Sequence, residues 1–449
     1  MGETIDSTDS SCTLRIAVVS GPQYDRLYER LQLFEQETGH RVQIVFRGSH
    51  PELNDYLAST FQCYDPKLLG SSSSSSTTAP ELDLISTHIK YAPSQAHFLQ
   101  ELGHNQVSEQ ERAEFLDAAL EASKVNGKLI QLPRMVDSRV LFYRADIFEA
   151  TDQRPPETWQ DLLSAASAIH KAALPVESPS NTRPELNVMQ GYVFPGKLSG
   201  LFGTFYELAM MEMQGTESLF DQEDQPVFDE SVVVRVLKYM RELVSSHGVP
   251  QDIEEYYFDE VSSLFSEGKV AMVADWPSFY GGMKQKLGLL APGVRVKVMR
   301  YPIGANGKRS AYSGMHSFAI PKSCRYPEQA LQLLKFLVRD DQQWIEASES
   351  GSFPTKKAVL QRVEEETERK RRAAEEGLDQ EQVVEAELDS ERLRCLQATV
   401  ENDMAMFPHL KAYPELEDAL YVMIQEAMMG RVSPEEAARR MREAAQAFI

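Results

Sequence analysis

Apolar and polar positions along the first part of the chain predict a strand, a helix and a second strand. Residues 14–21 form an apolar run typical of a buried strand, and residues 41–48 alternate apolar and polar positions as a half-buried strand does. Between them, apolar residues recur at helical spacing up to Gly39, where the helix is expected to end. This βαβ opening predicts an α/β protein with parallel strands.

A longer block, residues 125–172, continues the same alternation. It reads as a glycine turn, two apolar strands, a loop and a helix whose apolar positions recur three and four residues apart. Thr158 is expected to cap this helix, and Pro156 precedes it, where the chain is not yet helical. By itself the block indicates a strand-to-helix unit of the kind found in many α/β proteins.

Length and composition limit the classes of protein that are compatible with the chain. Its 449 residues exceed the ~250 to 300 at which one hydrophobic core stops growing, so two lobes are expected. No run of about 18 apolar residues occurs, which argues against membrane insertion, and the start lacks a signal peptide, which predicts a cytoplasmic location. The net charge of −22 and the lack of a basic stripe argue against nucleic acid as a partner.

Motifs for catalysis or metal binding are not found. The nine histidines are scattered without metal spacing, and the common nucleophile, phosphate-loop and dinucleotide motifs do not occur, so no cofactor, metal or catalytic residue is predicted. Four cysteines form no C-x-x-C motif. Three pairings are conceivable, but four unpaired thiols are favoured in so large a chain, and the redox compartment stays open.

Three motifs in register resemble the extracellular solute-binding proteins that feed sugar ABC transporters. They are matched by Asn126, Gly127, Lys128 and Pro133, then by Leu141, Tyr143, Asp146 and Phe148, and then by Pro156, Thr158, Trp159, Asp161 and Leu162. Further matches, such as FSEGKVAMVADWPSFYGGM and the C-terminal MMGRVSPEEAARRMREAAQAFI, extend the resemblance over nearly the whole chain. It implies an α/β type II periplasmic-binding-protein fold, with two lobes, an interlobe cleft and three hinge crossings near residues 135–137, 310–312 and 339–342.

The resemblance also implies a division into lobes. Residues 1–12 are expected to form a disordered tail. Lobe 1 is predicted to comprise residues 13–135 and 311–341, and lobe 2 residues 136–310 and 342–449. Two regions depart from the family pattern: a flexible Ser-rich insertion at residues 69–80 in lobe 1, and a charged arm at residues 363–394 in lobe 2, which is expected to be a solvated helix or partly disordered.

Candidate ligand-binding residues come from strand ends and from positions that the family directs at the cleft. A sugar needs flat aromatic rings for its C–H faces and planar polar groups for its hydroxyls. The predicted ligand-binding residues are Gln23, Tyr24, Thr87, His88, Asp137, Arg139, Phe202, Asp275, Trp276, Gly314 and His316.

Several of these residues have a structural alternative. Trp276 is interpreted either as a stacking platform or as a core residue that closes the second lobe, and Phe202 either as a cleft aromatic or as core. Asp137 and Arg139 are candidates for ligand contacts or for an interlobe salt bridge. The resemblance also fails in one place: Thr87 and Lys90 stand where maltodextrin-binding relatives have a Trp and an acid, which argues against a long malto-oligosaccharide.

The predicted function is reversible capture of a small polar solute, a carbohydrate, by hinge closure for ABC-type uptake. The expected partners are the solute and an ABC permease, and the protein is expected to be a monomer. The competing hypothesis is a cytoplasmic enzyme, or a regulatory or scaffold protein, that reuses the periplasmic-binding fold.

Overall fold

A computed structural model of the chain describes residues 11–62, 81–176, 187–287, 293–377 and 380–449, and its chain divides into two compact units. Unit 1 comprises Met1–Met135, Met315–Glu346 and Pro354–Val359. Unit 2 comprises Val136–Gly314, Ala347–Phe353 and Leu360–Ile449. This division differs from the lobes expected from sequence: the second crossing lies at residue 315 rather than 311, the third at 346 rather than 341, and residues 354–359 return to unit 1.

The sheet of unit 1 is built on β1 (Thr13–Val19), which lies between β2 (Arg41–Gly48) and β3 (Leu84–His88) and is parallel to both. The strand order is β12-β6-β11-β3-β1-β2, with β13 also pairing with β11. β11 (Ala311–Ala319) runs antiparallel to β3. Its remaining strands are β6 (Leu132–Ser138) and β12 (Phe353–Pro354). β13 (Met404–Ala405) belongs to unit 2 and pairs with the part of β11 that lies in unit 2. β4 (Lys124–Val125) and β5 (Lys128–Leu129) form a separate two-stranded sheet.

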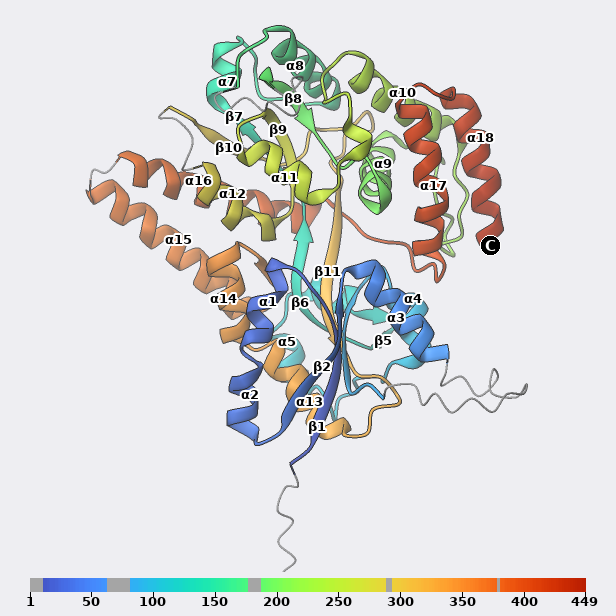
Figure 1. The fold of residues 1–449 in the computed structure, drawn as a ribbon, viewed down its shortest axis with the longest axis vertical. Coiled ribbons are helices and arrows are strands. Elements are labelled where there is room, and N and C mark those ends of the chain that lie inside the picture. The colour runs from blue at the N-terminus through green and yellow to red at the C-terminus, as the bar shows by residue number, and fades with distance from the viewer. Residues whose placement is uncertain (1–10, 63–80, 177–186, 288–292, 378–379) are drawn as a thin grey trace, which may run out of the picture. The chain divides into compact units, whose positions relative to one another are not determined.

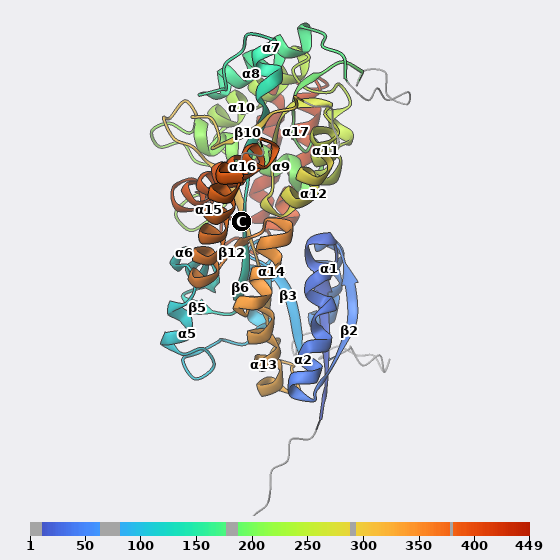
Figure 2. The same cartoon turned by 90° about the vertical axis from the view of Figure 1, so that its left-hand side faces the viewer.

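Helices cover both faces of the parallel strands in unit 1. On one side, α2 (Leu31–Thr38) and α13 (Pro327–Leu337) lie together, with the rings of Phe34 and Phe336 5.4 Å apart, and Figures 1 and 2 show α2 alongside β2. α3 lies on the other side. α2 ends as predicted, with Gly39 in the left-handed region at φ 76°. The remaining helices are α1 (Pro22–Glu29), α3 (His50–Gln62), α4 (Ala92–Gln95), α5 (Glu109–Ala113), α6 (Asp117–Ala122) and α14 (Asp340–Ser350).

Unit 2 has its own sheet, with strand order β10-β7-β9-β8. β7 (Val140–Arg144) is antiparallel to β9 (Val270–Asp275) and to β10 (Val296–Met299), whereas β8 (Gln190–Val193) is parallel to β9. Its helices are α7 (Ala145–Ala150), α8 (Trp159–Lys171), α9 (Leu198–Glu212), α10 (Glu230–Ser245), α11 (Phe258–Ser266), α12 (Tyr280–Leu287), α17 (Tyr413–Met428) and α18 (Pro434–Ala445). The predicted cap of α8 is confirmed, because the Thr158 hydroxyl accepts the backbone N–H of Asp161.

The described part of the charged arm is helical, which is one of the two forms expected from the sequence. It forms two helices, α15 (Lys357–Gly377) and α16 (Gln380–Asn402). α15 carries exposed ion pairs between residues three and four apart, such as Glu368 with Arg371 and Arg372, as a solvated helix does. α16, in contrast, buries Leu393 and Leu396. The charge pattern did not indicate this burial, because a mostly polar helix can be anchored by two buried leucines.

Other expectations concern segments that the structure describes only in part. The predicted tail of residues 1–12 ends before Cys12, because Cys12 is buried and its backbone carbonyl accepts the N–H of Arg41. Residues 1–10 and the Ser-rich insertion lie outside the described residues, as does Cys63. The described cysteines, Cys12, Cys324 and Cys395, form no disulfide bond with one another.

Candidate functional site

Two predicted site residues, His88 and His316, lie opposite each other in unit 1. β3 and β11 are antiparallel and pair these two residues in register, and side chains opposite each other on one sheet face are within reach. Their ring centroids are 4.9 Å apart. The sheet register thus brings together two histidines that are far apart in the sequence.

Tyr24 and His50 lie next to the pair of His88 and His316. The sequence analysis did not identify His50. The Tyr24 hydroxyl lies 2.8 Å from His50 Nε2 and 3.0 Å from His316 Nδ1. The His50 ring is 5.6 Å from that of His88 and 5.0 Å from that of His316. We call Tyr24, His50, His88 and His316 the imidazole cluster. His50 begins α3 just after β2 ends, so the rule that ligands gather at the carboxyl ends of strands could have identified it.

Two histidines of the imidazole cluster, His50 and His88, are kept neutral by their surroundings. Burial lowers the pKa of His50 well below its usual value, and the charges of His316, Lys90 and Arg134 lower it further. Burial likewise lowers the pKa of His88, together with His316, His50 and Lys90. Since an unperturbed histidine titrates near pH 6.5, both imidazoles are uncharged at pH 7 and act as hydrogen-bonding groups with flat apolar faces.

A buried ion pair stands beside the imidazole cluster. The Arg134 guanidinium carbon lies 4.7 Å from the centre of the Tyr24 ring. Arg134 Nε donates to Glu346 at 2.7 Å, and both side chains are at most 5% exposed. Burial works against the charge on Arg134, but Glu346 outweighs it and raises the pKa of the guanidinium. A permanent cation therefore rests against Tyr24.

In unit 2, the predicted residues Arg139 and Trp276 are brought together by the pairing of β7 with β9. Val140 lies opposite Asp275, so Arg139 and Trp276 extend the pairing by one position. The Arg139 guanidinium carbon lies 5.1 Å from the Trp276 ring centre, and the Phe258 ring meets the indole edge-on at 5.7 Å. Trp276 remains partly exposed. Its indole is thus supported from behind and keeps an accessible part, as a stacking surface requires.

Arg139 is held by Glu207, which the sequence analysis also missed. Their nearest atoms are 2.8 Å apart, and both side chains are at most 1% exposed. Glu207 also accepts the backbone N–H of Tyr312 at 3.0 Å. Around this pair, the hydroxyls of Tyr192 and Tyr301 and the Nε and Nη1 of Arg139 have no hydrogen-bond partner among the described residues. A charged residue within the apolar helix α9 was the available signal for Glu207.

Asp275 is a buried carboxyl group next to Trp276. One of its oxygens accepts the Trp276 backbone N–H at 2.8 Å, and the other has no hydrogen-bond partner in the described part of the chain. Burial raises the pKa of Asp275 to about 7, against the lowering effects of Ser262, the Trp276 backbone and Arg139. Near neutral pH this carboxyl group is therefore partly protonated and is able to donate a hydrogen bond as well as accept one.

The other predicted residues divide into two groups. Asp137 and Gly314 lie on β6 and β11, one residue away from a contact in which the hydroxyls of Ser138 and Ser313 are 2.8 Å apart. Of the remaining three, Thr87 and Phe202 are held in other contacts, and nothing is described of the side chain of Gln23. The Thr87 hydroxyl donates to Gln95 at 2.7 Å inside unit 1, Phe202 packs among Phe205, Tyr206, Phe228 and Tyr413 with 0% exposure, and the Gln23 side chain lies outside what the structure describes.

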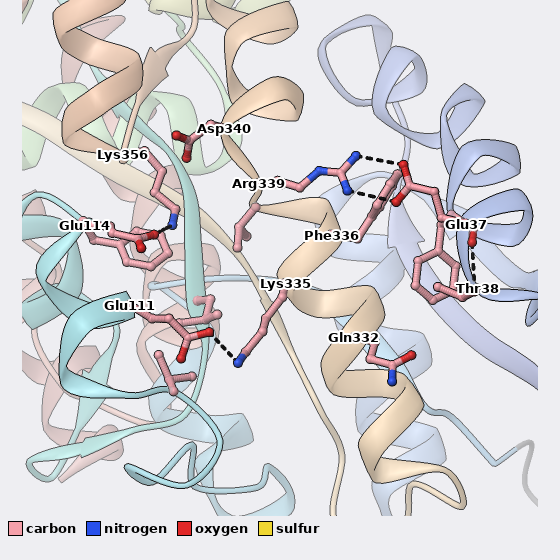
Figure 3. Close-up of a pocket in the computed structure, with 15 residues that line it drawn as sticks. Glu37, Thr38, Glu111, Glu114, Gln332, Lys335, Phe336, Arg339, Asp340 and Lys356 are labelled. Atoms are coloured by element: carbon pink, nitrogen blue, oxygen red, sulfur yellow. Dashed lines mark hydrogen bonds and ion pairs between the residues drawn. The ribbon is translucent and has the colours of Figure 1, made fainter. Parts of the chain in front are cut away.

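Unit 1 also contains a pocket of about 440 Å³ away from the imidazole cluster. Its apolar lining comes from Phe34, Val107, Phe115, Leu132, Phe336 and Val338. Figure 3 shows three ion pairs around it, Glu37 with Arg339, Glu111 with Lys335, and Glu114 with Lys356. Because these charges compensate one another and no predicted site residue lines the pocket, it does not share the chemistry expected of a sugar site.

Metal binding and membrane spans were also considered. Within the described ranges, no three side chains among His, Cys, Asp and Glu are arranged to hold a metal ion. In the imidazole cluster, His88 Nδ1 accepts the backbone N–H of Lys90 at 3.0 Å, so the proton of this ring resides on Nε2, the nitrogen that a metal would need. Among the helices that the structure describes, none combines the length and apolar character of a membrane span.

Comparisons with known proteins agree with this architecture. A "Probable ABC transporter-binding protein" of Deinococcus radiodurans is 25% identical over 337 residues, which cover 75% of this chain and 74% of the relative. The arabinooligosaccharide-binding protein of Bacillus subtilis is 23% identical over 236 residues, 51% of this chain and 48% of the relative.

Solved structures match over nearly the whole length. Maltose-bound MalE3 of T. maritima superposes with a TM-score of 0.73 at 21% identity and covers 98% of this chain and 100% of its own. A ribitol-bound ABC transporter solute-binding protein of Agrobacterium radiobacter K84 gives a TM-score of 0.73 at 19% identity, with 98% and 99% coverage. The predicted α/β fold of the type II periplasmic-binding proteins is thereby confirmed.

The family follows from a match that covers most of the chain. Residues 65–373 match the family described as bacterial extracellular solute-binding protein. The chain therefore belongs to the bacterial extracellular solute-binding proteins, the substrate-binding components of ABC transporters.

Proposed function

We propose that this protein reversibly captures a small carbohydrate or polyol and delivers it to an ABC permease. The observation that carries the proposal is the Trp276 platform in unit 2: a partly exposed indole backed by Arg139, with the hydrogen-bonding carboxyl group of Asp275 beside it. A sugar ring offers the matching combination, an apolar face and a rim of hydroxyls. Relatives named for arabino- and galactooligosaccharides, and structures with maltose, ribitol or mannitol, support this class of ligand.

In unit 1, the imidazole cluster remains a proposed place of ligand contact in its own right. Its imidazole nitrogens are hydrogen-bonding groups, and Tyr24 supplies an aromatic face. Asp137 and Gly314 remain proposed ligand contacts. Phe202 is not proposed again, because its ring is enclosed by core aromatics.

The proposal also concerns partners, chemistry and location. It includes a monomer that engages a permease and catalyses no reaction, in keeping with a family of binding proteins. The family is described as extracellular, so we propose that the protein works outside the cytoplasmic membrane. Fractionation of the native host, with the protein detected by antibody, tests this location.

The ligand claim is tested by thermal shift and calorimetry with a panel of sugars and polyols. A ligand bound only by the folded state stabilises it by RT ln(1 + [L]/Kd), about 2.7 kcal/mol at a hundredfold excess over Kd. Trp276→Ala is expected to weaken the binding of the best ligand at least tenfold, because burial and aromatic contact together exceed the 1.4 kcal/mol that corresponds to a factor of ten. Unchanged affinity in this variant, with a large loss of stability, would show that Trp276 only packs.

A further inference from the structure

The pocket of unit 1 has the size and the walls of a small-molecule site. Its volume of about 440 Å³ falls within the ~300 to 1,000 Å³ that is usual for ligand pockets. Three phenyl rings belong to its lining, those of Phe34, Phe115 and Phe336. Aliphatic side chains complete the apolar part, namely Val107, Leu132 and Val338. An apolar molecule of suitable size is therefore expected to leave water for this pocket.

Two lysines at the pocket are already engaged by acidic side chains. Lys335 Nζ donates to Glu111 at 2.6 Å, and Lys356 Nζ donates to Glu114 at 2.5 Å. Burial works to raise the pKa of Glu111, but hydrogen bonds from Lys335 and Ser108 outweigh it and lower this pKa to about 2. Glu111 is therefore a full negative charge that holds Lys335. Neither lysine is available to an anion unless an existing ion pair breaks.

The third basic side chain of the lining, Arg339, has two acidic partners. Its Nε donates to Asp341 at 2.6 Å, and its Nη1 donates to Glu37 at 2.9 Å. Both partners raise the pKa of the guanidinium and outweigh the effect of burial. Its carbon also lies 4.7 Å from the centre of the Phe336 ring. An anionic ligand thus finds no unpaired cation among the described residues that line the pocket.

Asp340 gives the pocket an excess of negative charge. Four acids belong to the lining, against the three bases Lys335, Arg339 and Lys356. Asp340 is the acid left over, because it is exposed and its side chain has no ion pair or hydrogen bond with another described residue. In Figure 3 its carboxylate is joined to none of the other residues drawn. It begins α14, where the helix dipole favours a negative charge without neutralising it.

We propose that this pocket is a second ligand site, which binds a small apolar molecule carrying one positive charge, with its apolar body against the phenyl rings and its cation at Asp340. The inference goes beyond the proposed capture of a carbohydrate, because it assigns a separate site of different chemistry in unit 1. The apolar walls supply affinity for any ring that fits, whereas the charge balance supplies the preference for a cation. An exposed ion pair of this kind corresponds to a preference of about three to five times.

Calorimetric titration with three indoles that share one ring system tests this inference. The probes are tryptamine, which is a cation at pH 7, tryptophol, which is neutral, and indole-3-propionate, which is an anion. Tryptamine is expected to bind about three to five times more tightly than tryptophol, and the anion is expected to bind most weakly. Because salt screens exposed charges, added salt is expected to reduce the preference for tryptamine and to leave the affinity for tryptophol nearly unchanged.

Asp340→Asn is the diagnostic variant for the charge, and Asp55→Asn is its control. Asp55 is an exposed acid on α3 in the same unit and does not line the pocket. Asp340→Asn is expected to bring the tryptamine-to-tryptophol affinity ratio close to one, whereas Asp55→Asn keeps the ratio of the parent protein. The ratio does not depend on the fraction of folded protein, so partial unfolding does not imitate the effect.

Phe336→Leu locates the ring of the ligand, and Phe61→Leu is its control. Both phenylalanines are buried in the core of unit 1, but Phe61 does not line the pocket. Phe336→Leu is expected to weaken the binding of all three indoles about threefold or more, because an aromatic contact is lost. Phe61→Leu is expected to leave these affinities unchanged. Circular dichroism before each titration verifies that both variants are folded.

Each contrary result overturns the inference and leaves the proposed carbohydrate binding untouched, because that proposal is tested with sugars and at other residues. If none of the three indoles binds, the pocket is not a ligand site. If tryptophol or indole-3-propionate binds as tightly as tryptamine, or if the two aspartate variants behave alike, the charge class is wrong. If Phe336→Leu and Phe61→Leu behave alike, the indoles bind elsewhere.

Discussion

Desolvation keeps a titratable group neutral in each of the two candidate sites, but the groups are of opposite kinds. In unit 1, burial and neighbouring positive charges hold His50 and His88 without a proton. In unit 2, burial keeps a proton on Asp275 up to about pH 7. The same cause, desolvation, thus removes a proton from a base and retains one on an acid, because it disfavours the charged form whatever its sign. The comparison teaches that acid is expected to disturb the unit 1 site by protonating His50 and His88, whereas alkali is expected to disturb the unit 2 site by ionising Asp275.

The buried ion pairs of the two units also differ. Arg134 donates two of its nitrogens to Glu346. Arg139 lies 2.8 Å from Glu207, but its Nε and Nη1 have no acceptor among the described residues. The pair in unit 1 is therefore a closed structural contact. The guanidinium in unit 2 has donors left over behind the Trp276 platform, for which ordered water is the usual partner.

The largest expected effect comes from breaking the pair in unit 2. Glu207→Ala leaves the fully buried charge of Arg139 without its partner, which is expected to lower the free energy of unfolding by about 3 to 5 kcal/mol. Denaturant unfolding measures this loss. Glu212→Ala is the control on the same helix, because its 3.8 Å pair with Arg235 is partly exposed and is worth about 0 to 1 kcal/mol. Equal losses in both variants would contradict the importance of the Arg139 pair.

The second prediction concerns the pH dependence of stability that Asp275 in unit 2 is expected to cause. The folded-state pKa of Asp275, about 7, lies above its unfolded value of about 3.9, so the folded state binds more protons between these limits. Its contribution to stability is therefore present at low pH and is lost as the pH rises to 7, up to about 4 kcal/mol in all. Asp275→Asn is expected to abolish this dependence.

Unfolding midpoints at pH 5 and pH 8 measure the effect of Asp275→Asn. The parent protein is expected to lose more stability between these values than the variant does. Asp152→Asn, an exposed change in the same unit, serves as the control and is expected to behave like the parent. A variant that loses as much stability as the parent would show that Asp275 is ionised in the folded state at neutral pH.

The smallest of these effects concerns unit 1 and has the opposite sign. The folded-state pKa of His50 lies below its unfolded value of about 6.5, so the unfolded state binds more protons and stability falls as the pH drops below 6.5. At pH 5 this amounts to at most about 2 kcal/mol for one histidine. His50→Gln should reduce the acid sensitivity, as measured by thermal unfolding at pH 5 and pH 7. His97→Gln, at an exposed position in unit 1, should leave it unchanged.

Much of the local structure could be predicted from the sequence, because it depends on neighbours along the chain. The left-handed Gly39 at the end of α2 and the Thr158 cap of α8 depend on residues within one helical turn, and both are confirmed. The family motifs identified the fold, the rule of strand ends suggested Tyr24 and His88, and the expected crossing between lobes suggested His316. The charged arm is helical, as one of its two expected forms, but its charge pattern did not reveal that α16 buries Leu393 and Leu396.

What the tertiary structure alone decided is which side chains meet. The pairing of β3 with β11 placed His316 opposite His88, and the pairing of β7 with β9 placed Arg139 beside Trp276. Register is a property of two distant segments, so no pattern in either one specifies it. The same holds for Glu207, which gains its role only because α9 carries it to Arg139. By itself the sequence determined the elements and the family, whereas packing of distant segments decided the contacts, burial and protonation of the candidate site.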